Sequence, residues 1–109
     1  MNKFSGKNLN ISIPSISTTT TIYLKGCFSF KALRELESAY QSLLNNPMIK
    51  IISINLAEVE HMDSSALGML LELRNQTQAA NMSLLLSSPS EISMQMFNVA
   101  CFAKIFTIE

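Results

Sequence analysis

The chain has 109 residues, of which 48% are hydrophobic and 15% are charged. This composition is typical of a single globular domain over residues 1–109, and it excludes a mainly disordered chain. Eight basic and eight acidic residues give a formal net charge of zero, and no basic stripe or like-charge block indicates nucleic-acid binding or a charged tail.

The two cysteines, Cys27 and Cys101, lie far apart, and neither belongs to a cluster with metal-ligand spacing. We therefore expect two buried free thiols in a reducing compartment, with no metal and no cofactor. Residues 1–10 are polar and lack the apolar core of a signal peptide. Every apolar run is far below the roughly 18 residues of a membrane span. The sequence thus predicts a cytoplasmic protein without a membrane span.

Two strands are predicted near the N-terminus. Residues 9–13 alternate between apolar and polar side chains, which indicates a half-buried strand that ends at Pro14. Thr18–Leu24 is rich in β-branched residues and predicts a second strand, closed by Gly26. The two strands are expected to form a hairpin.

A helix over Phe30–Leu44 and a strand over Lys50–Leu56 are predicted next. Ser29 is the expected N-cap, and Phe30 begins an apolar side with three-and-four spacing. Pro47 follows the helix closely, as is typical of a helix end. The strand is almost continuously apolar, which is the pattern of a central strand covered by helices.

A second helix is predicted over Ser64–Ala80, with Asp63 as its N-cap. Residues 57–62 are expected to be a short acidic connection that leads into it. Gly68 costs this helix about 1 kcal/mol relative to alanine, so we expect either close packing or a close partner at that position. The predicted sheet-facing side of the helix consists of Ala66, Leu70, Leu73, Thr77 and Ala80.

The remaining predicted elements complete an α/β fold. Met82–Leu86 and Lys104–Ile108 are expected strands, and Ser88–Glu91 begins a helix between them. The apolar stripe of that helix is predicted to be Ile92, Met96, Val99 and Ala100. The order β-β-α-β-α-β-α-β predicts a mixed sheet with a parallel core. We expect the helices Phe30–Leu44 and Ser64–Ala80 on the same face of it.

The clearest candidate site is Asp63-Ser64-Ser65, where a strand gives way to a helix. Asp63 caps the helix, so Ser64 and Ser65 lie at the positive end of its dipole. A phosphate on an exposed hydroxyl would meet a favourable field there. A simple helix cap is the alternative interpretation of these residues.

The motif Asp63-Ser64-Ser65-Ala66-Leu67-Gly68 after an apolar strand resembles the phosphorylation site of the STAS domain family, in particular its stand-alone bacterial anti-sigma factor antagonists. Leu24-Lys25-Gly26 upstream and Phe102-Ala103-Lys104-Ile105-Phe106 downstream extend the resemblance to residues 10–109. It implies a STAS-like mixed sheet with helices packed on one face. It also implies that a partner serine kinase phosphorylates Ser64.

The sequence departs from the antagonist pattern in three places. Gly26-Cys27-Phe28-Ser29 lacks the acids that help those proteins to bind a kinase and its nucleotide, and Ala66 replaces a frequent glycine. We also expect the helix that ends the family's fold to be absent.

The resemblance implies a phospho-switched interaction module of a bacterial partner-switching pathway, not an enzyme. Its unphosphorylated form would bind a partner, and phosphorylation of Ser64 would release it. The implied partners are a serine kinase that resembles an anti-sigma factor and a serine phosphatase, with room for an oligomer. Asp63 and Ser65 are expected to support the phosphosite. The expected partner-binding face, on the side of the helix away from the sheet, consists of Ser65, Gly68, Met69, Glu72 and Gln76.

Two alternatives remain at this point. A constitutive STAS subunit of a lipid-transport ABC complex would use the same helix face without phosphorylation, and a ligand-binding STAS module would need a pocket. A hydrolase built from His61, Asp63 and Ser64 is disfavoured, because consecutive residues seldom converge and the nucleophile-elbow motif is missing.

Overall fold

The computed structural model describes residues 8–109, which form one five-stranded sheet in the order β1-β2-β3-β4-β5. The strands are β1 (Leu9–Ser12), β2 (Thr19–Phe28), β3 (Ile51–Met62), β4 (Ser83–Ser87) and β5 (Thr107–Ile108). β1 is antiparallel to β2, and each later neighbour pair is parallel. The predicted hairpin and the mixed sheet with a parallel core are therefore confirmed.

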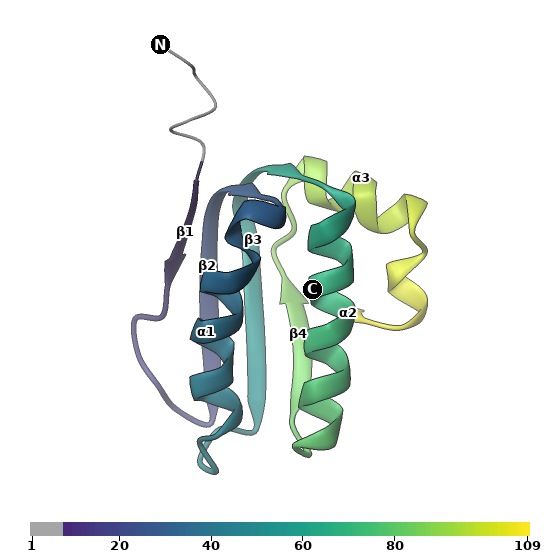
Figure 1. The fold of residues 1–109 in the computed structure, drawn as a ribbon. Coiled ribbons are helices and arrows are strands. Elements are labelled where there is room, and N and C mark those ends of the chain that lie inside the picture. The colour runs from purple at the N-terminus through teal and green to yellow at the C-terminus, as the bar shows by residue number, and fades with distance from the viewer. Residues whose placement is uncertain (1–7) are drawn as a thin grey trace.

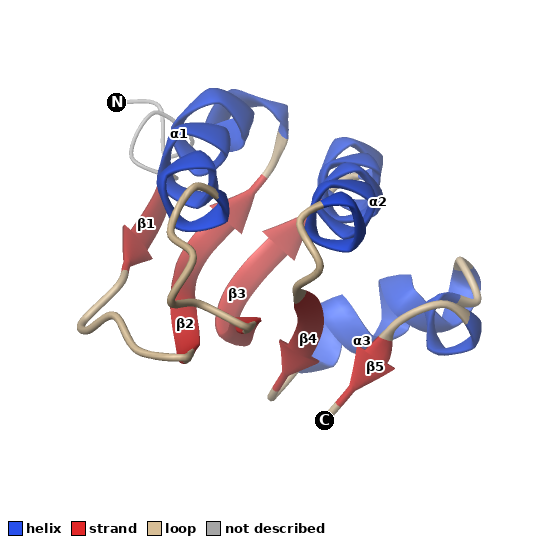
Figure 2. Ribbon diagram, turned by 90° about the horizontal axis from the view of Figure 1, so that it is seen from below, coloured by secondary structure: helices blue, strands red, loops and turns tan. Residues whose placement is uncertain are grey.

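The helical elements are η2 (Phe30–Ala32), α1 (Leu33–Leu44), α2 (Ser64–Ala79), α3 (Glu91–Val99) and η3 (Phe102–Lys104), where η denotes a 3-10 helix. α1 and α2 lie side by side on one face of the sheet, as predicted (Figures 1 and 2). Right-handed crossovers place both there, because β2, β3 and β4 are laid down in one direction across the sheet. α3 lies near the carboxyl end of β4 and packs against β3 (Figure 1).

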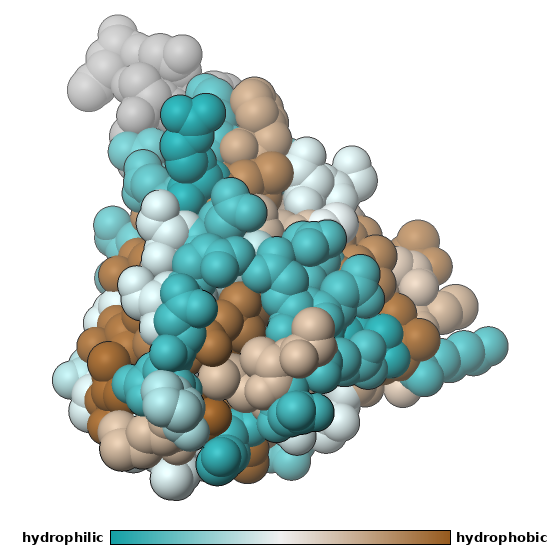
Figure 3. Space-filling model, turned by 60° about the horizontal axis from the view of Figure 1, so that its bottom comes forward, coloured by the Kyte–Doolittle hydropathy of each residue, from teal (hydrophilic) through white to brown (hydrophobic). Residues whose placement is uncertain are grey.

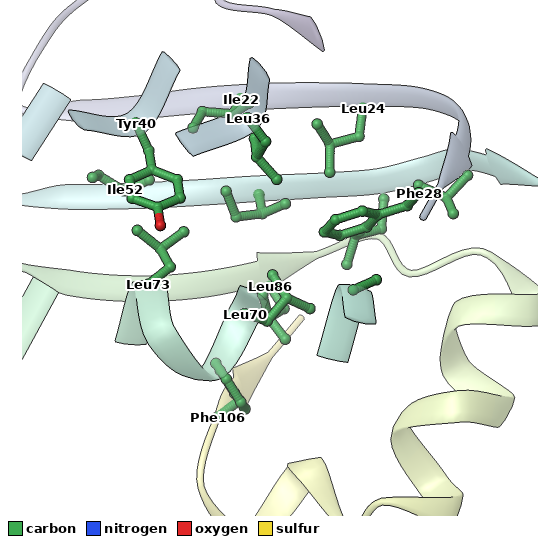
Figure 4. Close-up of a cluster of buried hydrophobic side chains, with 14 of the residues drawn as sticks. Ile22, Leu24, Phe28, Leu36, Tyr40, Ile52, Leu70, Leu73, Leu86 and Phe106 are labelled. Atoms are coloured by element: carbon green, nitrogen blue, oxygen red, sulfur yellow. The ribbon is translucent and has the colours of Figure 1, made fainter. Parts of the chain in front are cut away.

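The core lies between the sheet and the α1–α2 layer (Figure 4). Alternate residues of β2 and β3 enter it because successive side chains of a strand point to opposite faces. The helices contribute residues at three-and-four spacing, as predicted from their periodicity, except that Ala80 is exposed just beyond the end of α2. Fully or almost fully buried members include Ile22, Leu24, Phe28, Leu36, Tyr40, Leu43, Ile52, Ile54, Leu56, Leu70 and Leu73.

The prediction of an acidic connection at residues 57–62 is wrong, because β3 continues to Met62. Leu56, Val59 and Met62 are buried at intervals of three, whereas Ala57, Glu58, Glu60 and His61 are exposed. Two register shifts against β2 account for this spacing, since each breaks the two-residue alternation. The long strand carries the chain from the sheet to the start of α2.

The prediction that Gly26 closes β2 is wrong. Gly26 lies within β2, at one of these two register shifts. Its φ is +106°, a conformation that residues with a side chain rarely adopt. A Cβ atom built there would lie 2.4 Å from the carbonyl oxygen of Asn8, which accepts a hydrogen bond from the Cys27 amide. Glycine is required here by both conformation and space.

Three predictions about the helices are corrected. Ser29 makes no side-chain capping bond, and Phe30 is 63% exposed, so neither has the predicted role at the start of the first helix. Val99 is 87% exposed and Ala100 is also exposed, so the predicted stripe of α3 is wrong at its end. Ser93 and Phe97 are the buried residues instead, and Phe97 stacks on Phe102 with a centroid distance of 5.3 Å.

The end of the molecule that carries the loops after α1 and α2 is largely polar, with apolar side chains exposed in separate areas (Figure 3). Within the described part of the chain, no helix is both long enough and apolar enough to cross a membrane.

Substitution of the two glycines by alanine should have opposite effects on stability. We expect Gly26→Ala to lower the free energy of unfolding by more than about 1 kcal/mol, because the new Cβ meets the Asn8 carbonyl and φ is unfavourable. Gly68→Ala is the matched control. A Cβ at Gly68 meets nothing within 4 Å, so the variant should gain up to about 1 kcal/mol of helix propensity. Urea denaturation measures both, and equal shifts would contradict the bulge at Gly26.

Candidate functional site

Asp63 caps α2, as predicted. Its backbone is extended, with φ −112° and ψ 178°, and its Oδ1 accepts a hydrogen bond of 3.1 Å from the Ala66 amide. This bond satisfies one of the amides that an α-helix leaves without an intrahelical partner in its first turn. The start of α2 is therefore fixed at Ser64.

The second oxygen of the same carboxylate reaches the neighbouring connection. Asp63 Oδ2 accepts a hydrogen bond of 3.3 Å from the Phe30 amide, at the first residue of η2. The Asp63 amide in turn donates to the Phe28 carbonyl oxygen at 3.3 Å. One residue thus joins the starts of η2 and α2, which explains why Ser29 is not needed as a cap. This link could not be predicted from the sequence, because the two bonded residues are 33 positions apart.

The two serines of the motif differ in exposure. Ser64 is exposed at the first position of α2, and its hydroxyl makes no hydrogen bond to any described residue. Ser65 is half-buried. Of the pair, Ser64 therefore offers the more accessible hydroxyl, beside a carboxylate that both helix starts hold in place.

The predicted partner-binding residues separate into two groups. Gly68 and Glu72 are exposed, one and two turns beyond Ser64. Ser65, Met69 and Gln76 are half-buried, as expected for the side of the helix that faces α1. Whether any of the five binds a partner remains a prediction.

Met69 and Gln76 contact α1 directly. The Tyr40 hydroxyl donates to Met69 Sδ at 3.3 Å, and Gln41 Nε2 donates to Gln76 Oε1 at 2.7 Å. Met69 is half-buried and packs against the core rather than standing in solvent. The exposed side of α2 is a different row of residues, which we call the Ser64 ridge: Ser64, Gly68, Leu71, Glu72 and Asn75.

The α1–α2 contact is neutral at its centre. Burial, together with the nearby carboxylates of Glu37 and Glu72, raises the pKa of Tyr40 to about 12. The phenol consequently keeps its proton, and its bond to Met69, at any physiological pH. The hydrogen bonds that join α2 to α1 through Met69 and Gln76 therefore do not change with pH in the physiological range.

The other candidate chemistries gain no support from the geometry. His61 is exposed on β3, opposite Cys27, and no hydrogen bond joins it to Asp63 or Ser64. Among residues 8–109, no cluster of three or more His, Cys, Asp or Glu side chains could hold a metal ion. The arrangement at Asp63 and Ser64 offers an accessible hydroxyl at a helix start.

Removal of the Asp63 carboxylate should loosen both helix starts. We expect Asp63→Ala to lower the free energy of unfolding by about 0.5–2 kcal/mol, the usual cost of losing an N-cap. Amide hydrogen exchange should accelerate at both Phe30 and Ala66. Asp63→Asn is the matched control, because it keeps one acceptor oxygen and replaces the other by an NH2 donor, so it should protect only one of the two amides. Unchanged exchange at Phe30 in Asp63→Ala would contradict the link between η2 and α2.

Known proteins share this fold and sequence pattern. A STAS-domain containing protein of Pseudomonas aeruginosa (strain UCBPP-PA14) is 31% identical over 88 residues, which cover 81% of this chain and 85% of the relative. The anti-sigma factor antagonist SpoIIAA in its unphosphorylated form matches with a TM-score of 0.75 at 18% identity, over 94% of this chain and 88% of SpoIIAA. The Bacillus cell fate determinant SpoIIAA in its phosphorylated form gives a TM-score of 0.69 at 18% identity, over 94% and 91% of the two chains.

The solved structures show that the mixed sheet and its helices form a SpoIIAA-like α/β fold. The STAS domain family matches residues 10–109, nearly the whole of the described chain. This chain belongs to the STAS domain family.

Proposed function

We propose that this protein is a phospho-switched interaction module of a bacterial partner-switching pathway. Its unmodified form binds a protein partner, and phosphorylation of Ser64 by a serine kinase releases that partner. The observation that carries the proposal is the exposed, unbonded Ser64 hydroxyl at the start of α2, beside the anchored Asp63.

The electrostatics of this position suit a switch. A phosphate on Ser64 adds a charge of about −1.5 to −2, which the positive end of α2 tolerates within the protein. It also stands next to the negative Asp63, whose oxygens bond the Ala66 and Phe30 amides. Repulsion between the two anions weakens the hold of Asp63 on Phe30. Phosphorylation at the start of α2 thereby loosens the hydrogen bond at the start of η2.

The Ser64 ridge provides the surface through which the switch acts. Gly68 lies one turn after Ser64, and no packing within the described chain accounts for a glycine there, because a Cβ would meet nothing within 4 Å. Close approach of a partner is then the remaining reason for a glycine at this position. Leu71 adds a 38% exposed apolar side chain. Burying a phosphate against such an interface carries a large desolvation cost, so the modified form dissociates.

The relatives support the partner class that we propose. SpoIIAA is an anti-sigma factor antagonist that has both an unphosphorylated and a phosphorylated form. By analogy, the partner of this chain is a cytoplasmic serine kinase that resembles an anti-sigma factor, and a serine phosphatase resets the switch. The kinase supplies the nucleotide, so the chain itself needs no catalytic group or cofactor.

Charge at Ser64 should control partner binding. We expect Ser64→Asp to weaken capture of the cognate kinase by at least about tenfold, whereas the neutral control Ser64→Asn, of nearly the same shape, should retain most of it.

Mass spectrometry of the protein from its native cells should find phosphate on Ser64 and none after Ser64→Ala. Ser65→Ala should leave the modification in place. Phosphate on Ser65 alone would contradict the assignment, and binding that ignores every Ser64 variant would favour a constitutive subunit.

Gly68 offers a test of the ridge that is independent of charge. Gly68→Gln places a long neutral side chain in solvent and should not destabilise the helix, since glutamine has the higher helix propensity. If a partner approaches the ridge closely, this variant should melt no lower than the wild type yet bind the partner at least about tenfold more weakly. Asn75→Gln, farther along the ridge, is the control for added bulk. Undiminished binding by Gly68→Gln would place the interface elsewhere.

A further inference from the structure

A cavity of about 340 Å³ lies on the opposite side of α2 from its contact with α1, between α2, β4 and the chain before β5. In Figure 2 these three elements lie next to one another at the side of the sheet that carries β5. Its described lining combines the buried apolar residues Met82 and Phe106 with polar groups from Gln78, Ser83 and Thr107. Arg74 is the charged residue among the lining residues that the structure describes.

Arg74 is held at this place by the backbone. Its Nε donates a hydrogen bond of 3.0 Å to the Ile105 carbonyl oxygen. β4 and β5 pair at Leu85↔Thr107 and Leu86↔Ile108, and the ladder does not extend to the earlier residues of β4. In a continued parallel ladder the Ile105 carbonyl would accept from the Leu84 amide. The arginine therefore occupies the point where strand pairing stops, and the cavity opens beside it.

The charge of Arg74 is not neutralised within the described chain. It makes no ion pair with any described carboxylate, and no described residue that lines the cavity is acidic. Its side chain is half-buried, so solvent screens it less than a fully exposed arginine. A guanidinium fixed through Nε still has two terminal nitrogens, whose N–H groups match the oxygens of a phosphate or carboxylate.

We propose that this cavity binds a small polar molecule that carries one oxyanion group, a phosphate or a carboxylate, on Arg74. The volume lies at the lower end of the range for small-ligand sites, which suits a ligand of few atoms. The hydroxyls of Ser83 and Thr107 and the Gln78 amide provide hydrogen-bonding groups around the anion or the rest of the ligand.

The proposed site is independent of the phosphorylation switch. Arg74 lies ten residues beyond Ser64 on the same helix, a rise of about 15 Å. A ligand there would connect α2, β4 and the chain before β5, so its binding should raise the melting temperature of the domain. Ser64→Ala, which tests the switch, should leave this binding unchanged.

Three related probes test the proposal on the full-length chain: glycerol 3-phosphate, glycerate and uncharged glycerol, at constant ionic strength in a phosphate-free buffer. We expect saturable binding of at least one anion by calorimetry, with amide NMR shifts centred on Arg74, Ser83 and Thr107, and no binding of glycerol. The tighter of the two anions identifies the oxyanion as phosphate or carboxylate.

Two arginine substitutions provide matched controls. Arg74→Gln removes the charge but keeps an N–H donor for the Ile105 carbonyl. This variant should bind the anion at least about tenfold more weakly than the wild type does. Arg34→Gln makes the same change of charge at an exposed position on α1 and should bind as the wild type does. No saturable binding of either anion up to about 10 mM, a level that detects even weak sites, would overturn the proposal. Equal weakening by both substitutions, or NMR shifts centred on Ser64, would overturn it as well.

Discussion

One carboxylate determines how the helical layer begins. Asp63 follows the long strand β3, and its two oxygens accept hydrogen bonds from the Phe30 amide at the start of η2 and from the Ala66 amide in the first turn of α2. Because a strand end, a 3-10 turn and a helix start all converge on this side chain, their relative positions are not independent. These hydrogen bonds of Asp63 also fix the position of the accessible Ser64 hydroxyl. The modification that we propose for Ser64 would act on a point where three elements meet, rather than on a peripheral loop.

Much of the fold could be predicted because its signals are local. The β1–β2 hairpin, the two helices on one face and the α2 cap all follow from periodicity and cap chemistry within short windows. The extension of β3 to Met62 could not, because its bulged pairing with β2 replaces alternation by burial at every third residue. The place of Gly26 could not be predicted either, because a glycine within a bulge and a glycine at a strand end look alike in sequence.

In the candidate site, too, the features with local signals could be predicted, whereas those that depend on distant residues could not. Asp63 and Ser64 were identifiable because a cap and its first helical residue are neighbours in sequence. The environment of Met69 was not, because it depends on where Tyr40 of α1 is placed across the helix pair. Helical phase alone tells which residues lie away from the sheet, but not which of them a second helix covers. The cavity at Arg74 likewise arises from the distant Ile105, which no spacing in the sequence brings to α2.

The burial of Tyr40 also gives the domain a convenient optical property. The chain contains two tyrosines and no tryptophan. Tyr40 is fully buried with its hydroxyl on Met69, whereas Tyr23 is 45% exposed on the face of the sheet away from α1 and α2. The near-ultraviolet spectrum therefore combines one chromophore in a fixed asymmetric setting with one largely in water. Its circular dichroism reports chiefly on whether α1 and α2 remain together, and it does so without any introduced label.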